Sequence, residues 1–311
     1  MKLLTPQDLS NESYQALEEI SGSDLNTVYQ KSLAHWKYGE SKSSKALEFG
    51  IVSHAMILEP ERFDDEFVKQ MDIAEYPDAM VTVKDMQAWL KERGQKVSGD
   101  KAEITSRILD VCEVSGEKVF IWDLMLVEFA ELHSEKTIVP VADYEKVQLM
   151  RDSILSDESM RKMLRGGVAE HSIIGKLPSC KVANKVRPDL ITAGGHLVNY
   201  KTARDIHPEY FGKHCHDLGY LLKASLEWDM FTELYGEPPK AYIFLAQEKE
   251  APYVWKPYYI TPEQLSIGRA QREYAQSLIE NAIETGKYSA YGSQPAPLEL
   301  PEYIMKKYGE L

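Results

Sequence analysis

The sequence is poor in cysteine and contains no long apolar run. Its three cysteines, Cys112, Cys180 and Cys215, are scattered along 311 residues. An odd number of isolated cysteines indicates free thiols in a reducing compartment, and three thiols cannot supply the four ligands of an iron–sulfur cluster. No stretch of 18 apolar residues occurs, and the N-terminus (MKLLTP) has too few apolar residues for a secretion signal. We therefore expect a cytoplasmic protein with no membrane partner.

Basic residues are also in the minority. The chain has 36 Lys and Arg against 49 Asp and Glu, a formal net charge of −13. This balance excludes a protein whose whole surface binds nucleic acid, but it allows a local basic groove. Between residues 180 and 204 the only acid is Asp189, and the basic residues are Lys181, Lys185, Arg187, Lys201 and Arg204. The alternative is that these basic side chains are merely exposed to solvent along a strand edge.

The pattern of apolar residues predicts a mixed α/β or α+β fold. Hydrophobic and charged contents of 43% and 27% are ordinary for a soluble globular protein. Residues 6–70, 120–132 and 142–164 have helical patterns. The remaining chain predicts strands at 171–177, 180–191, 196–201, 240–247 and 253–260, with helices at about 208–235 and 262–286. We expect a central mixed sheet flanked by helices.

A short hairpin is the most informative local feature. Apolar-bearing runs at 182–191 and 196–200 flank a glycine turn at 192–195, which is typical of adjacent antiparallel strands. Side chains alternate along a strand, so Asn199 and Lys201 share a face, and the turn can bring Asp189 beside them. Carboxylates that hold divalent cations, next to a lysine that orients water, suit phosphodiester cleavage. On spacing alone, a hairpin with merely solvated polar side chains is an equally good interpretation.

The spacing resembles the PD-(D/E)xK nuclease motif, and other stretches narrow the resemblance to the RecE-type exonucleases (the exonuclease VIII family). Residues 32–38 and 46–60 are similar to that family's N-terminal helices, 247–253 to its late strand, and 286–291 to the end of its C-terminal helix. The resemblance covers most of the chain apart from about 72–140. It implies the PD-(D/E)xK fold, with a central mixed sheet flanked by helices.

The resemblance also implies an activity. The protein would be a 5′-to-3′ exodeoxyribonuclease that uses Mg²⁺ or Mn²⁺ and degrades linear double-stranded DNA from its ends. The 3′ single strand that it leaves would pass to an annealing protein in phage-type recombination. The resemblance further implies a ring-shaped homo-oligomer, encoded by a phage or prophage and acting in the bacterial cytoplasm.

Individual roles follow from the resemblance residue by residue. His54, in the context Gly50-x-x-x-His54, stands where the family has a metal-ligating histidine, and Glu170 matches its upstream acid. Without the resemblance, His54 would more simply be a helix histidine whose hydrogen bonds are satisfied within the protein, and Glu170 a solvent-exposed glutamate. The implied catalytic residues are Glu170, Asp189, Asn199 and Lys201, and the implied metal ligands are His54, Asp189, Asn199 and Tyr200.

Two positions depart from the family pattern. Asn199 replaces an Asp or Glu, and the loss of charge predicts weak metal occupancy and little cleavage. The site is either naturally degenerate or carries a deliberate Asp-to-Asn change that traps DNA uncut. We favour the deliberate change, because the rest of the site is maintained. We therefore expect Asn199→Asp to restore activity. Lys223 stands where the family usually has glutamine. Lys223 could contact a phosphate in its place, or it could simply be a lysine on a partly exposed helix.

Residues 82–113 form a second recognisable unit. A capping box at 82–85, a glycine stop at Gly94 and a second helix start at 98–103 predict two short helices. This unit resembles the SAP motif, a small DNA-binding module whose phosphate contacts carry no sequence information. Its predicted DNA contacts are Lys84, Lys91, Arg93, Lys96, Lys101 and Arg107. Acids in the same window balance these charges, so a hairpin that packs on the core or on a neighbouring subunit is the alternative.

The expected organisation is therefore an N-terminal helical part of the nuclease domain (1–75), the SAP-like insertion (80–115), and the nuclease core with C-terminal helices (116–311). Two other functions remain open. One is a catalytically degenerate protein that binds DNA ends, and the other is an endonuclease of the same superfamily.

Overall fold

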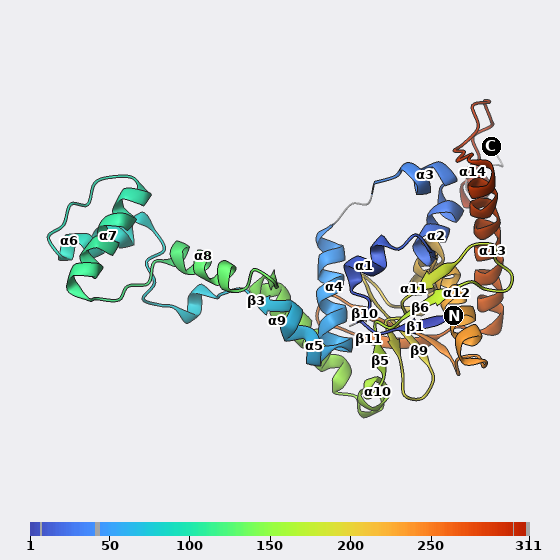
Figure 1. Ribbon diagram of the computed structural model, residues 1–311, viewed down its shortest axis with the longest axis horizontal. Coiled ribbons are helices and arrows are strands. Elements are labelled where there is room, and N and C mark those ends of the chain that lie inside the picture. Colours follow the sequence, from blue (N-terminus) through green and yellow to red (C-terminus); the bar gives the residue numbers. More distant parts are fainter. Residues whose placement is uncertain (7, 41–43, 301, 309–311) are drawn as a thin grey trace. The chain divides into compact units, whose positions relative to one another are not determined.

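The computed structural model describes residues 1–6, 8–40, 44–300 and 302–308, which form two compact units with separate hydrophobic cores. The first unit combines Met1–Lys42, Arg165–Ala246 and Lys256–Leu311, and the second combines Ser43–Leu164 and Gln247–Trp255 (Figure 1). The second unit thus contains both the SAP-like segment and the helix that bears His54.

The first unit is built around two sheets. The four-stranded sheet has the order β1 (Lys2–Leu4), β6 (Ser172–Gly175), β7 (Asn184–Val186), β2 (Ile20–Ser21). The five-stranded sheet has the order β11 (Trp255–Tyr259), β10 (Tyr242–Glu248), β9 (Leu197–Ala203), β8 (Leu190–Ile191), β5 (Val168–Ala169). β2 pairs with β7 in parallel, whereas β5, β8 and β9 pair antiparallel. The expected mixed sheet and α/β class are confirmed.

The strand predicted at 180–191 is wrong as a single element. β7 and β8 belong to different sheets and are separated by Arg187, Pro188 and Asp189. Pro188 has no N–H to donate to a ladder, so pairing stops there. The turn that follows β8 is as predicted: the N–H of Thr192 donates to the carbonyl of His196 at 2.9 Å, and Gly195 has a φ of +80°.

The described part of the first unit also contains helices (Figure 1). They are α1 (Asn11–Ala16), α2 (Gly22–Gln30), α3 (Leu33–Tyr38), α11 (Pro208–Asp217), α12 (Tyr220–Tyr235), α13 (Pro262–Thr285) and α14 (Glu302–Tyr308). The helix predicted at 208–235 breaks into α11 and α12 at Gly219, whose φ of +65° favours glycine. α12 packs closely against α13, because a Cβ on Gly268 would lie 2.1 Å from the carbonyl oxygen of Leu221.

The second unit is mainly helical. Its elements are α4 (Lys45–Leu58), α5 (Pro60–Glu66), β3 (Phe67–Lys69), η1 (Ile73–Glu75), α6 (Val83–Glu92), α7 (Lys101–Ser115), α8 (Trp122–Leu132), β4 (Thr137–Val139), α9 (Val141–Leu155) and α10 (Glu158–Leu164). β3 and β4 pair in parallel, and α4 packs on α9. The helix predicted at 142–164 is interrupted between α9 and α10. None of the described helices combines the length and apolar character needed to cross a membrane.

The two helices of the SAP-like segment begin where the sequence predicts. Thr82 and Asp85 form the capping box of α6, and Asp100 with Glu103 forms that of α7. Gly94, with φ of +66°, ends α6: its N–H and the next one donate to carbonyls of the last turn. A small core joins the pair through Met80, Met86, Leu90, Ile104, Ile108 and Ile121.

Candidate active site

Glu170, Asp189 and Asn199 lie next to the last paired residues of three neighbouring strands, β5, β8 and β9. The β5–β8 ladder pairs Ala169 with Leu190, so one further step places Glu170 opposite Asp189. The β8–β9 ladder pairs Leu190 with Val198, which places Asp189 opposite Asn199. Directly opposite residues have Cβ atoms about 4.5–5.5 Å apart on the same face. The two registers therefore bring three polar side chains together from separated parts of the chain.

Asp189 is fixed by two groups on β9. The backbone N–H of Tyr200 donates to its Oδ2 at 2.7 Å, and Nζ of Lys201 lies 3.5 Å from the same oxygen. Nζ of Lys201 also donates to the Tyr200 carbonyl at 3.0 Å. Asp189 is 8% exposed. The predicted convergence of Asp189 and Lys201 at the start of the hairpin is present in the structure.

Glu170 has a backbone conformation uncommon for its residue type. Its φ is +52°, and its N–H donates to the carbonyl of Asp189 at 3.3 Å. One of its carboxylate oxygens lies within 4.8 Å of one from Asp189. A left-handed backbone at a non-glycine residue costs on the order of 1–3 kcal/mol and is concentrated at functional sites. Here it turns the Glu170 carboxylate toward Asp189.

Asn199 is buried and has an unusual set of contacts. It lies near Tyr242 on the adjacent strand β10, whose hydroxyl donates to Oε2 of Glu227 on α12 at 2.9 Å. Among the described residues, Oδ1 of Asn199 has no hydrogen-bond partner. An unsatisfied buried polar atom costs roughly 1–3 kcal/mol, so this oxygen is available to a ligand.

These oxygens fit a divalent cation. The carboxylates of Glu170 and Asp189 converge, and hard oxygen ligands of this kind are what Mg²⁺ and Mn²⁺ prefer. The Tyr200 phenol is fully buried, and burial raises its pKa, so only the carbonyl of this predicted ligand has the right chemistry. The donor set carries at most two negative charges, from Glu170 and Asp189.

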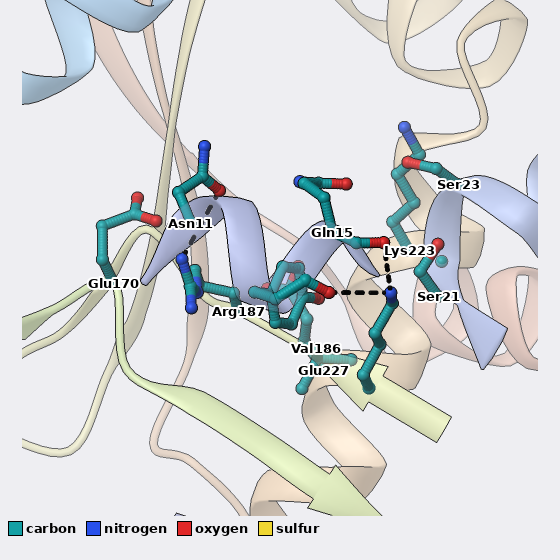
Figure 2. Close-up of a pocket in the computed structure, with 12 residues that line it drawn as sticks. Asn11, Gln15, Ser21, Ser23, Glu170, Val186, Arg187, Lys223 and Glu227 are labelled. Carbon is teal, nitrogen blue, oxygen red and sulfur yellow. Dashed lines mark hydrogen bonds between the residues drawn. The ribbon is translucent and has the colours of Figure 1, made fainter. Parts of the chain in front are cut away.

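A cavity of about 230 Å³ in the first unit includes Glu170 in its lining. Figure 2 shows Glu170 and Arg187 toward one end and Lys223 and Ser23 toward the other. Burial lowers the pKa of Lys223, and the neighbouring Lys201 adds to this effect. Burial, reinforced by the charge of Asp189, raises the pKa of Glu227 to about 7. The cavity wall therefore carries titratable groups of both signs.

Comparison with known proteins identifies the superfamily. Residues 26–294 match the model of a family described as "PDDEXK-like domain of unknown function (DUF3799)". The chain belongs to this family. The PD-(D/E)xK fold expected from the sequence is confirmed, and the chain is a member of that nuclease superfamily.

Solved structures agree on the fold. A crystal structure of a "putative exonuclease" from Eubacterium rectale matches with a TM-score of 0.54 and 13% identity, covering 100% of both chains. At this identity the likeness supports the fold alone. A search of curated proteins finds no match.

Three basic residues near the PD-(D/E)xK motif have partners within the chain. Nζ of Lys185 donates to the carbonyls of Tyr14, Gln15 and Leu17 at the C-terminal end of α1. Arg187 donates to the Ser172 hydroxyl and the Leu9 carbonyl, each at 2.8 Å, and Lys181 pairs with Glu284 at 2.7 Å. These three cations therefore stabilise the chain itself, and the local basic groove that the charge balance allows stays a prediction.

The remaining predicted residues lie in the second unit. His54 is half-buried on α4, and its metal role stays a prediction. Arg93 forms a forked pair with Glu117 and stacks on Trp89, its Cζ 3.8 Å from the ring centroid. Lys101 pairs with Asp123, and Arg107 donates to the carbonyls of Lys96 and Ser98. Lys84, Lys91 and Lys96 have exposed side chains.

Two residues near this site, Glu227 and Tyr242, were not predicted from the sequence. Glu227 is an acid within a run of buried residues on α12, one turn after Lys223. An acid within such a run is a usable signal, because carboxylates are seldom fully buried without a partner. Tyr242 offered no signal, since a tyrosine at the start of an apolar strand is ordinary.

Proposed function

We propose that this protein is a metal-dependent deoxyribonuclease that degrades linear double-stranded DNA from its ends. The observation that carries the proposal is the pair of carboxylates of Glu170 and Asp189, which have ligand oxygens within 4.8 Å of each other, with Nζ of Lys201 3.5 Å from Asp189. The resemblance to RecE-type exonucleases adds the finer features: 5′-to-3′ polarity, a 3′ single-stranded product, and a role in phage-type recombination.

The chemistry follows from this arrangement. Asp189 and Glu170 would hold a divalent cation, with Oδ1 of Asn199 and the Tyr200 carbonyl as further ligands and His54 added by the resemblance. When bound, such a cation polarises the phosphate and makes a coordinated water more acidic. Lys201 orients that water and offsets negative charge as the phosphate is attacked. Mg²⁺ or Mn²⁺ is the proposed cofactor.

Asn199 sets the expected level of activity. An amide is a neutral ligand, so the cation is held by less negative charge than in a site with three acids. We expect slow cleavage by the chain as it stands, and faster cleavage after Asn199→Asp. The same loss of charge favours a second candidate function, in which the protein binds DNA ends without cutting them.

One experiment separates these functions. The protein and Asn199→Asp are incubated with end-labelled linear duplex and with closed circular duplex, with Mg²⁺, Mn²⁺ or EDTA. Asp189→Asn serves as the site knock-out and Asp205→Asn, at an exposed acid, as the matched control. We expect Asn199→Asp to degrade linear DNA from its 5′ ends and to spare circles. Cutting of circles would instead indicate an endonuclease.

The outcome that overturns the nuclease proposal is equally definite. If Asn199→Asp with either cation leaves all duplexes intact, while binding end-labelled DNA tightly, the end-binding function is correct. The proposed ring and annealing partner are tested separately, by light scattering of the purified protein and by capture of a co-expressed single-strand annealing protein.

A further inference from the structure

Aromatic side chains from two distant segments of the first unit lie together. The segments are residues 31–40, which contain α3, and residues 286–291, which follow α13. The N–H of Ala34 donates to the carbonyl of Ser289 at 3.1 Å, so the two backbones are joined directly. The aromatic cluster that results consists of His35, Trp36, Tyr38, Tyr288 and Tyr291.

Contacts between rings hold the aromatic cluster together. The ring centroids of Trp36 and Tyr38 lie 6.1 Å and 6.2 Å, respectively, from that of Tyr288. The ring centroids of His35 and Tyr291 are 6.0 Å apart. Aromatic pairs prefer centroid separations of about 4.5–7 Å. The rings are therefore positioned by one another before any ligand arrives.

Packing within the protein accounts for only part of the aromatic cluster. Trp36 and Tyr288 are half-buried and pack against the main hydrophobic core of the first unit. These two rings join α3 to the segment that follows α13. Tyr38 and Tyr291 instead remain 71% and 73% exposed. Since stabilisation by an aromatic ring comes mainly from its burial, these two rings contribute little to the fold and offer their faces to a partner.

Basic side chains accompany the exposed rings. The two segments contain three exposed lysines, Lys31, Lys37 and Lys287, and a single acid, Glu40. Their local charge is therefore +2, in a chain whose net charge is −13. Nζ of Lys37 lies 5.2 Å from the centroid of the Tyr288 ring, so one of these amines is held against the aromatic cluster. The combination of exposed rings and positive charge favours a polyanion that has flat faces.

We propose that the aromatic cluster binds single-stranded DNA, with bases stacked on Tyr38 and Tyr291 and phosphates beside the three lysines. Proteins that bind single strands without sequence preference combine aromatic side chains and basic residues in this way. In a duplex the faces of the bases are covered by their neighbours, so stacking on protein rings selects an unpaired strand. This inference deepens the proposed function, on which it rests only for the source of the strand: degradation of one strand leaves the other unpaired.

The test measures binding of a short fluorescein-labelled oligo(dT) strand by fluorescence anisotropy, in EDTA so that no metal-dependent cleavage occurs. Tyr38→Ala and Tyr291→Ala should each weaken binding by about 5- to 100-fold, which corresponds to the loss of one stacked base. Tyr38→Phe retains the ring and should bind as the wild type does. Tyr259→Ala is the matched control, because Tyr259 on β11 is also 73% exposed and lies outside the aromatic cluster.

An abasic strand of the same length separates stacking from charge. This strand keeps the phosphates and lacks the bases, so the wild type should bind it more weakly than oligo(dT), and neither alanine variant should weaken it further. Lys37→Gln should lower the affinity for both strands and reduce the slope of log affinity against log salt by about 0.7. If the alanine variants lose the same factor on both strands, the rings have a structural role only and the inference is wrong.

Other outcomes separate this inference from the proposed function. Wild-type affinity for oligo(dT) in Tyr38→Ala and Tyr291→Ala would overturn the inference, whatever the cleavage assays show. Equal affinity of the wild type for oligo(dT) and the abasic strand would overturn it without any variant, and so would tighter binding of a blunt duplex that depends on both tyrosines. Oligo(dT) binding that depends on both rings, in a protein that cleaves no DNA even as Asn199→Asp, would support the inference and refute the nuclease.

Discussion

The backbone N–H of Tyr200 donates to Oδ2 of Asp189 at 2.7 Å, so a ladder position of β9 is used to orient a carboxylate rather than to pair with another strand. The same oxygen lies 3.5 Å from Nζ of Lys201. One acid is therefore held from two successive residues of one strand. This geometry couples cation binding to the position of the lysine.

Lys201→Met should remove catalysis and leave cation binding intact. In the Asn199→Asp background, we expect cleavage of linear duplex to fall on the order of 10²–10³-fold, because a group that stabilises charge in the transition state is lost. Mn²⁺ affinity should stay the same or increase, since a neighbouring positive charge is removed. Lys213→Met, on the exposed face of α11, is the control. Undiminished cleavage by Lys201→Met would show that the lysine is not catalytic.

Glu227 should make the stability of the protein depend on pH. Burial raises its pKa from 4.5 to about 7, so between these values the folded protein retains a proton that the unfolded chain has released. The free energy of unfolding therefore falls as pH rises through this window, by about 3 kcal/mol from this group, and is unaffected by it above the window.

Glu227→Gln should remove this component of the pH dependence. Urea unfolding of the wild type and of Glu227→Gln, at intervals from pH 4.5 to 8, gives the difference between their free energies of unfolding at each pH. Glu280→Gln, at another buried glutamate of the first unit, is the control and should retain the pH dependence of the wild type. Parallel curves for the wild type and Glu227→Gln would contradict the raised pKa.

Gly268→Ala should destabilise the first unit. A Cβ at this position would lie 2.1 Å from the Leu221 carbonyl oxygen, so α12 and α13 would have to move apart. Overpacking of this kind typically costs about 1–3 kcal/mol. Gly212→Ala, in α11, is the matched control because a Cβ there meets nothing within 4 Å. Equal midpoints of thermal unfolding for the two variants would show that the helices do not pack this closely.

The SAP-like hairpin should contribute phosphate contacts through its exposed lysines. We expect Lys84→Glu and Lys91→Glu to weaken binding to long duplex DNA, and the slope of log affinity against log salt to fall by about 0.9 for each lost contact. Cleavage of short duplexes should be largely retained. Lys101 and Arg107 are less clean targets, because their pairing with Asp123 and with loop carbonyls stabilises the hairpin itself. An unchanged salt slope would exclude DNA binding by this segment.

Local signals in the sequence determined the helix starts and the turn of the hairpin. Capping residues such as Thr82 and Asp100, and the glycine at position 195, act within a few residues of themselves. The alternation of side chains along β9 likewise fixed that Asn199 and Lys201 share a face. The acid and lysine of the site were therefore predictable from spacing together with family resemblance.

Only the tertiary structure decided which side chains surround Asn199. The sequence pattern treated residues 180–191 as one strand, whereas pairing in two different sheets divides them around Pro188. Tyr242 on the neighbouring strand lies near Asn199 and donates to Glu227 on α12. Lys185 and Arg187 donate to backbone carbonyls. Strand register and helix packing depend on contacts between distant segments, which local pattern does not encode.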